Sequence, residues 1–142
     1  MSRFNLRSYG IIIKDNKLLV SKEYYESVDK LFLKLPGGGV ELSESPKEAL
    51  LRELQEELNI NAETGDVLHI GEKSYQSMFD KSWVVCIYWK VLHWDRKIIT
   101  NQKIDHDKNK GWQILQWVDL EELKIKDFTF CSDQEVVEKI LK

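Results

Sequence analysis

One segment, residues 38–60, constrains the fold more than any other part of this chain, because it predicts where a helix begins and ends. Ser45 is suited to the N-cap, Pro46 to the first helical position, and Glu48 stands where it completes a capping box. Asn59 tolerates the left-handed conformation that ends many helices. We therefore expect a helix between Ser45 and Asn59.

The expected helix has an acidic face and an apolar face. Glu53, Glu56 and Glu57 lie within one turn and share an arc of about 100°. A second arc is apolar and comprises Leu50, Leu51, Leu54 and Leu58. We expect the leucines to pack on a core and the acids to face outward, with the small Ala49 leaving room for an ion. Clustered carboxylates repel one another on a bare helix and suit Mg²⁺ or Mn²⁺.

Three successive glycines, Gly37, Gly38 and Gly39, precede this helix. Glycine allows the backbone to approach a ligand closely, so the carbonyls can join carboxylates around an ion and the amides can face phosphate oxygens. A tight turn explains the glycines alone, and a solvated face explains the acids alone. Their combination at this spacing favours one metal and phosphate site.

The same residues resemble a known motif. Gly38, Glu44 and the run Arg52–Ile60 resemble the Nudix box, G-x5-E-x7-R-E-U-x-E-E-x-G-U, in which U is bulky and apolar. Every defined position matches except Asn59, which replaces a glycine and also accepts a left-handed cap. The preceding Leu-Pro-Gly-Gly and the later segment 117–123 resemble the family as well.

The resemblance implies a fold and a reaction. Nudix domains are α/β/α sandwiches with a mixed sheet between helices, and we expect one such domain over residues 1–142. Nudix hydrolases use water and a divalent ion to cleave a nucleoside diphosphate linked to another moiety, X. Nucleoside triphosphates, ADP-ribose, nucleotide sugars and dinucleotides are all candidate substrates. Dimers are common in the family, which leaves a homodimer open.

The resemblance also assigns a metal site. Glu56 and Glu57 correspond to the principal ligands of Mg²⁺ or Mn²⁺, and Glu53 to a further ligand or the general base. Gly37 or Gly38 corresponds to a carbonyl ligand. Bound metal neutralises a pyrophosphate and acidifies water, and a carboxylate beside that water can take its proton.

Arg52 and Glu44 correspond to the pair that orients the box. Many Nudix enzymes carry an additional glutamate in a loop well after the box, but this chain has only aspartates there, among them Asp105 and Asp107. Because the helix fixes its position, Glu53 is the predicted base, and the two aspartates are the alternative.

Substrate recognition is expected in the connections around this site. Aromatic side chains in or beside connections could stack on a base, although core packing is the plainer explanation, and they include Tyr24, Tyr25, Phe32 and Phe79. The predicted substrate residues are Tyr24, Phe79 and Phe128. Lys34, just before the glycines, could reach a phosphate, although a solvated lysine is the plainer explanation. Gly39 adjoins the same site, and because some nucleotide-cleaning members carry lysine there, their substrate preference does not transfer.

Composition fits one enzyme domain. The 142 residues allow a single core, and 42% are hydrophobic and 32% charged. The net charge of −3 argues against a nucleic-acid polymer as partner. Cys86 and Cys131 are far apart, which suggests the reducing cytoplasm. No signal peptide or membrane span is expected.

Other elements are expected from patterning. The expected strands are Tyr9–Ile13, Leu18–Ser21, Leu31–Leu35, Asp66–Gln76, Trp83–Trp94 and Trp112–Val118. Residues 95–111 read as an irregular loop. A last helix should begin at Ser132, with Glu135 completing a second capping box. Its buried face should comprise Val136, Val137, Ile140 and Leu141.

Two rival functions remain. The chain could be a non-catalytic Nudix-fold module that senses a nucleotide sugar, although a sensor would be free to lose Glu53, Glu56 or Glu57. It could also be an interaction domain whose acidic face meets a basic partner, which predicts no metal dependence.

Overall fold

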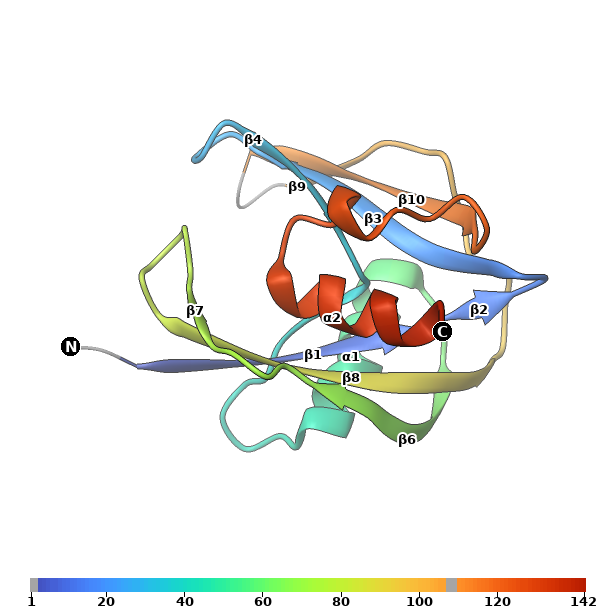
Figure 1. Cartoon of the computed structure of the whole chain (residues 1–142), viewed down its shortest axis with the longest axis horizontal. Coiled ribbons are helices and arrows are strands. Elements are labelled where there is room, and N and C mark those ends of the chain that lie inside the picture. The colour runs from blue at the N-terminus through green and yellow to red at the C-terminus, as the bar shows by residue number, and fades with distance from the viewer. Residues whose placement is uncertain (1–2, 107–109) are drawn as a thin grey trace.

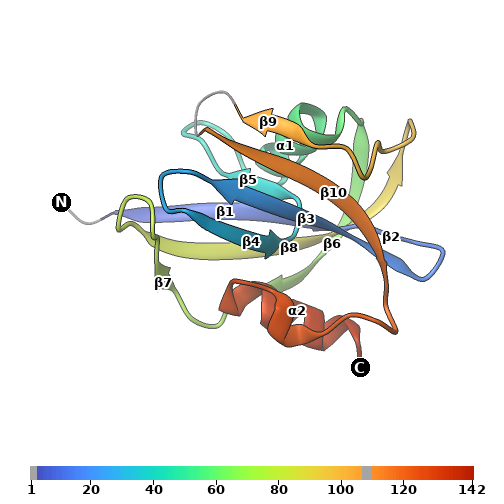
Figure 2. The same cartoon turned by 90° about the horizontal axis from the view of Figure 1, so that it is seen from above.

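Two sheets with a helix on either side make up residues 3–106 and 110–142, the part of the chain that the computed structural model describes. Figures 1 and 2 show α1 (Pro46–Leu58) and α2 (Cys131–Ile140) on opposite sides of the sheets. Asp107 lies outside the described residues, so its place in the site is not described.

The first sheet is mixed. Its strands are β5 (Gly37–Gly39), β1 (Phe4–Ile11), β8 (Trp83–Trp94) and β6 (Ala62–Ile70), in that order, with β7 (Tyr75–Gln76) also on β8. β1 and β8 are parallel, and the other pairs are antiparallel. Because β1 is central, it places its side chains beside both β5 and β8.

The second sheet is antiparallel throughout its described strands. Its order is β2 (Ile13–Lys14), β3 (Lys17–Tyr25), β10 (Gly111–Asp119) and β9 (Ile104–His106), with β4 (Lys30–Lys34) also on β3. Asp15 and Asn16 join β2 to β3 with φ of 52° and 60°, the backbone of a tight hairpin turn. A short 3-10 turn, η1 (Ile125–Asp127), precedes α2.

The predicted mixed α/β fold with helices on both sides is confirmed, but its strands form two sheets rather than one. The glycines form β5 instead of a loop, and β9 lies within the segment expected to be irregular. β6 begins before the expected Asp66, at Ala62, and ends at Ile70. Register shifts along β6 break the alternation of its side chains, which hides the strand from a period-two pattern.

The caps of α1 are confirmed. Ser45 accepts from the Glu48 amide, the Glu48 carboxylate accepts from the Ser45 amide, and Asn59 is left-handed with φ 55°. The helix buries Ala49, Leu50, Leu54 and Leu58. The expectation of outward acids is wrong for Glu57, whose Oε2 atom is buried. Ala49 is fully buried, so it opens no space at the surface.

The start of α2 differs from the prediction. The N-cap is Phe130, not Ser132, and it caps without a side-chain hydrogen bond. Glu135 instead accepts from the Glu72 amide and lies 2.7 Å from His69 Nε2, so partners on another element take the carboxylate away from the helix end. Val136 and Val137 are buried as predicted, whereas Leu141 is exposed.

Two hydrophobic clusters hold the layers together. One cluster joins β1, β3 and β8 to α2, and the other joins β3, β8 and β10 to α1. β3 contributes to both, because Leu18 and Val20 face the first cluster and Leu19 faces the second. The second cluster contains Leu50, Leu54 and Leu58, so it fixes the rotation of α1 and hence the direction of its acids.

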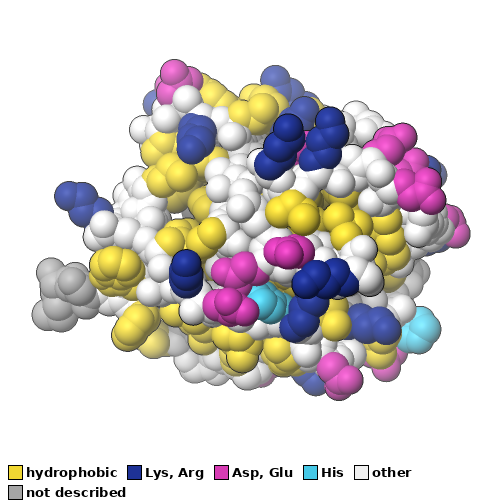
Figure 3. Space-filling model, in the orientation of Figure 1, with side chains coloured by type: hydrophobic (Ala, Val, Ile, Leu, Met, Phe, Trp, Pro, Cys, Tyr) yellow, Lys and Arg dark blue, Asp and Glu magenta, His cyan; other side chains and the backbone are white. Residues whose placement is uncertain are grey.

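The surface that carries α2 is chemically mixed. Figure 3 shows basic, acidic and hydrophobic side chains interspersed over this face. Among the described helices, neither is long and apolar enough to cross a membrane.

Candidate active site

Arg52 ties the start of α1 to the segment before it. Its Nε lies 3.1 Å from Glu44 Oε2 and its Nη2 lies 2.7 Å from Glu44 Oε1. Nη2 also donates to the Gly39 carbonyl, at 2.9 Å. The hydrogen bond from Arg52 lowers the pKa of Glu44. The structure thus joins Arg52, Glu44 and β5 in one rigid corner.

Glu53 packs directly on the glycine strand. Arg52 Nη1 donates to Glu53 Oε1 at 3.1 Å. A β-carbon at Gly38 would lie only 2.5 Å from the Glu53 carboxylate, so only glycine allows this approach. The Glu53 side chain is 15% exposed, and its burial raises its pKa. A carboxylate that is partly buried and held at one oxygen is suited to proton transfer at the other.

Glu57 points inward, toward the sheets. It accepts a hydrogen bond from the Gly37 backbone, and within the described residues its buried Oε2 has no hydrogen-bond partner. Burial, and next the neighbouring charge of Glu23, raise the pKa of Glu57 to about 8. A buried carboxylate oxygen without a partner is costly, and a bound cation would satisfy it.

Glu56 faces solvent and is held by Arg52, with Nη1 3.2 Å from Glu56 Oε2. Within residues 3–106 and 110–142, no three acidic, histidine or cysteine side chains converge closely enough to hold a metal. The donors nevertheless suit a hard cation, since they are three carboxylates beside glycine carbonyls. Glu56 would have to turn away from Arg52 to join Glu53 and Glu57 around an ion.

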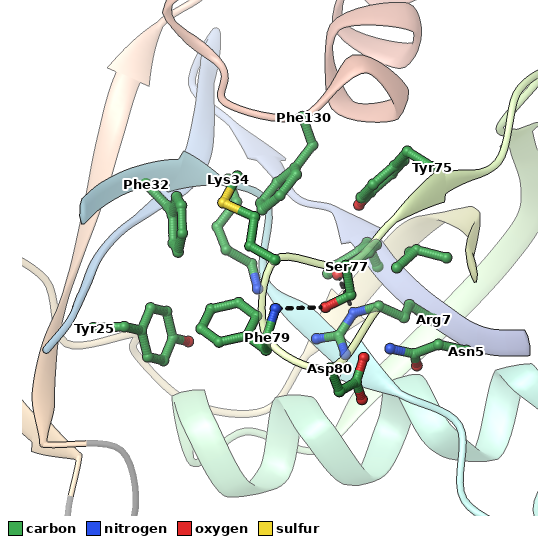
Figure 4. Close-up of a pocket in the computed structure, with 13 residues that line it drawn as sticks. Asn5, Arg7, Tyr25, Phe32, Lys34, Tyr75, Ser77, Phe79, Asp80 and Phe130 are labelled. Carbon is green, nitrogen blue, oxygen red and sulfur yellow. Dashed lines mark hydrogen bonds between the residues drawn. The ribbon is translucent and has the colours of Figure 1, made fainter. Parts of the chain in front are cut away.

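A pocket of about 280 Å³ opens beside this corner, between the two sheets (Figure 4). The second sheet lines it with side chains of β3 and β4, and the first sheet lines it with side chains of β1, β7 and β8 and of the connection from β7 to β8. The lining residues are Asn5, Arg7, Tyr9, Tyr25, Phe32, Lys34, Tyr75, Ser77, Met78, Phe79, Asp80, Val84 and Phe130. The pocket therefore combines aromatic walls with two cationic groups.

Lys34 is buried in this pocket rather than solvated. Its Nζ lies 3.9 Å from Glu23 Oε1 and 5.3 Å from the centre of the Tyr9 ring. Glu23, a buried acid that the sequence analysis missed, also accepts from Ser21 and Tyr25. The alternation of Ser21, Glu23 and Tyr25 along β3 is the one signal that could have placed Glu23 on an inner face.

Arg7 connects the pocket to the acids of α1, and no pattern in the sequence singles it out. Its Nε donates to the Tyr9 hydroxyl at 2.6 Å. A β-carbon at Gly39 would lie 3.6 Å from Arg7 Nη1. The charge of Arg7 also lowers the pKa of Glu53, although burial outweighs this effect. Arg7 thus lies between the base candidate and the aromatic pocket.

The structure brings only some of the expected substrate residues to this pocket. Lys34 and Phe79 line it, and Gly39 adjoins it through Arg7. Tyr24 instead stacks on Trp112 and donates to Asp29. Successive side chains of a strand face opposite ways, so Tyr25 rather than Tyr24 reaches the pocket.

Two further candidates lie elsewhere. Phe128 is buried in the core beside α2 and lines a different pocket, so it is not brought to the aromatic pocket. Asp105 is exposed in β9, paired in register with Trp112 of β10. Among the described residues, no hydrogen bond or ion pair joins Phe128 or Asp105 to the acids of α1.

A protein-family model shows which family the chain belongs to. The model of the NUDIX domain matches residues 5–138, nearly the whole chain. The chain belongs to the Nudix family. The residues that resemble the Nudix box, from Gly38 to Ile60, lie within the matched range.

Solved structures give the same fold. The solution structure of the E. coli ORF135 protein has a TM-score of 0.72 and 26% identity, covering 99% of this chain and 90% of that one. A MutT Nudix hydrolase from Burkholderia pseudomallei has a TM-score of 0.70 and 18% identity, over 99% and 98% of the two chains. A sequence comparison with curated proteins gives no match.

A third structure comes from work on MutT of Aliivibrio salmonicida and Vibrio cholerae. It has a TM-score of 0.62 and 22% identity, over 98% of both chains. As a member of the Nudix family, the chain is a Nudix hydrolase, an enzyme that acts on the pyrophosphate bond of nucleoside diphosphate derivatives. Nudix hydrolases generally use divalent metal ions.

Proposed function

We propose that this Nudix hydrolase is a Mg²⁺-dependent pyrophosphohydrolase of a small nucleoside diphosphate derivative, with Mn²⁺ as the alternative ion. The buried Oε2 of Glu57 carries the proposal, since among the described residues it has no hydrogen-bond partner and it lies in a cluster of negative charge. A divalent ion would both coordinate this oxygen and neutralise the surrounding negative charge. Cys131 is an exposed free thiol, which suits the reducing cytoplasm that we propose as its location.

The roles of the chain's own residues follow from their contacts. Bound Mg²⁺ would neutralise the pyrophosphate and acidify a water molecule. Arg52 holds Glu53 at Oε1, so the proton of the attacking water would pass to Oε2. Arg52 and Glu44 would hold α1 in a fixed position against β5. Because Gly38 has no side chain, it would let the Glu53 carboxylate lie against β5, close to the scissile bond.

The test is a panel of nucleotides incubated with Mg²⁺ or with a chelator. Nucleoside triphosphates, ADP-ribose, nucleotide sugars and dinucleotides would each be followed by product analysis and by phosphate release after a coupling phosphatase. We expect a nucleoside monophosphate to form from at least one substrate, and only with the metal. Tight nucleotide binding without any turnover would instead favour a sensor and overturn the proposal.

Glu56→Gln tests the metal site without disturbing the core, because Glu56 is exposed. Losing one ionised ligand should raise the Mg²⁺ concentration needed for half-maximal activity about tenfold or more. Glu138→Gln on α2 removes the same charge from an exposed surface position and serves as the matched control. If Glu56→Gln and Glu138→Gln show the same Mg²⁺ dependence, Glu56 is not a ligand.

A further inference from the structure

We propose that the aromatic pocket selects nucleobases that present a carbonyl oxygen, the 6-oxopurines and 4-oxopyrimidines, over their amino counterparts. The proposal rests on the proposed function and names the substrate class of the same site. Its two elements are the aromatic walls of the pocket and the paired cations of Arg7 and Lys34.

The walls of the pocket suit a flat ring. Phe79 meets Tyr25 and Phe32 edge-on, with ring centres 5.1 and 5.9 Å away. Phe130 lies 5.5 Å from Phe32 and is stacked at 5.5 Å on Tyr75. A nucleobase would stack on such walls. A volume of about 280 Å³ leaves room for a nucleobase.

The charged ends at the pocket can only donate hydrogen bonds. Arginine and lysine side chains carry no acceptor atom. Figure 4 shows the ends of Arg7 and Lys34 pointing toward the same part of the pocket, beside Phe79. Their like charges repel each other. An electron-rich group between them would relieve that repulsion.

Nearby acids offset the charge of the two cations but do not remove their capacity to donate. Glu23 lies 3.9 Å from Lys34 Nζ, Glu53 lies within the field of Arg7, and Arg7 itself donates to the neutral Tyr9 hydroxyl. Asp80, which also lines the pocket, forms an ion pair with the exposed Arg3. Arg7 and Lys34 therefore remain hydrogen-bond donors at the pocket, although neighbouring acids offset their charge.

The chemistry of the bases then separates them into two groups. Guanine and hypoxanthine present O6 and N7, and uracil and thymine present O4, all of which accept hydrogen bonds. Adenine and cytosine present an amino group at the same place, which would face donors and leave them unpaired. Asn5, which also lines the pocket, can donate or accept and does not discriminate.

The kinetic test uses pairs of nucleotides that differ at this one position. ITP should be hydrolysed with a kcat/KM about ten- to a hundredfold above that of ATP, and UTP with a similar advantage over CTP. Arg7→Gln supplies both a donor and an acceptor, so it should bring both ratios close to one. Arg96→Gln makes the same substitution at an exposed position and should leave both ratios unchanged.

A binding test separates this proposal from the proposed function. Titration calorimetry with IMP, AMP and ribose 5-phosphate requires no turnover and no variant. Tighter binding of IMP than AMP would support base selection even if the chain hydrolysed nothing. Equal binding of IMP and AMP would overturn it even if hydrolysis were rapid. Ribose 5-phosphate binding as tightly as IMP would also overturn it, because the phosphate would then occupy the cations.

Discussion

Glutamate occupies three different environments on α1, at Glu53, Glu56 and Glu57. Glu56 is 60% exposed and paired with Arg52, whereas Glu53 is 15% exposed and packed on Gly38. The carboxylate oxygen Oε2 of Glu57 is buried, and the pKa of Glu57 is raised to about 8. The differences arise from the rotation of α1, which turns Glu57 toward the sheets and Glu56 toward water. These environments suit the different roles that we propose, an exposed ligand at Glu56, a base at Glu53 and an inward-facing ligand at Glu57.

A prediction at the residue scale concerns the base. Glu53→Gln keeps the size of the side chain and its contact with Gly38 but removes proton acceptance. We expect kcat to fall by about 10²–10⁴-fold, with a smaller change in KM. Steady-state kinetics at saturating Mg²⁺ would measure this. Asp105→Asn, on exposed β9, should cost far less. A larger loss for Asp105→Asn would move the base out of α1.

At the scale of elements, α1 could be predicted from sequence because its signals are local. Ser45, Glu48 and Asn59 act within one turn of the helix ends, and the leucines repeat at helical spacing. α2 could not be placed as well, because His69 from β6 binds Glu135 and prevents the expected capping box. Local patterns fail wherever a distant element supplies a stronger partner.

The pocket was the least predictable part of the site. Arg7 on β1 and Glu23 on β3 lie far from the box in sequence, and only the pairing of strands brings them beside it. The prediction of Tyr24 instead of Tyr25 has the same cause. The sequence shows that successive side chains of β3 face opposite sides of the sheet, but not which side faces the pocket. The glycines of β5 carry no side chains, so no alternation marks them as a strand.

A prediction at this scale concerns the cap of α1. Ser45→Ala removes the acceptor of the Glu48 amide, which leaves one donor of the first turn without its partner. The free energy of unfolding should fall by about 1 kcal/mol, within a range of roughly 0.5–2. Urea unfolding followed by circular dichroism would measure it. Ser74→Ala, at an exposed position, should change it by less than about 0.5 kcal/mol. Equal effects of the two substitutions would contradict this role of Ser45.

At the scale of the whole molecule, the fold brings negatively charged side chains close together where the substrate is expected to bind. β3, β4 and α1 bring Glu23, Lys34 and Glu57 into one buried space, and Lys34 only partly offsets the two acids. The protein without metal should therefore be less stable than its packing alone would allow. Binding a cation would recover part of that stability, which couples the fold to its catalytic ion.

The last prediction follows from the pKa of Glu57, about 8 in the folded protein and about 4.5 in the unfolded chain. Because the folded state holds this proton more tightly, the contribution of Glu57 to stability is full below pH 4.5 and is lost as the pH rises toward 8. Without metal, the melting temperature should fall over this window. Millimolar Mg²⁺ should raise it most at the alkaline end, where the carboxylate is ionised.

Scanning calorimetry with and without Mg²⁺, at about pH 6 and about pH 9, would test this linkage. Glu57→Gln should raise the metal-free melting temperature near pH 9 by several degrees, since it removes a buried charge. It should also abolish most of the rise caused by Mg²⁺. Glu138→Gln should do neither, because Glu138 is exposed. If Glu57→Gln keeps the full Mg²⁺ response, the ion binds without Glu57, and the buried carboxylate has a purely structural origin.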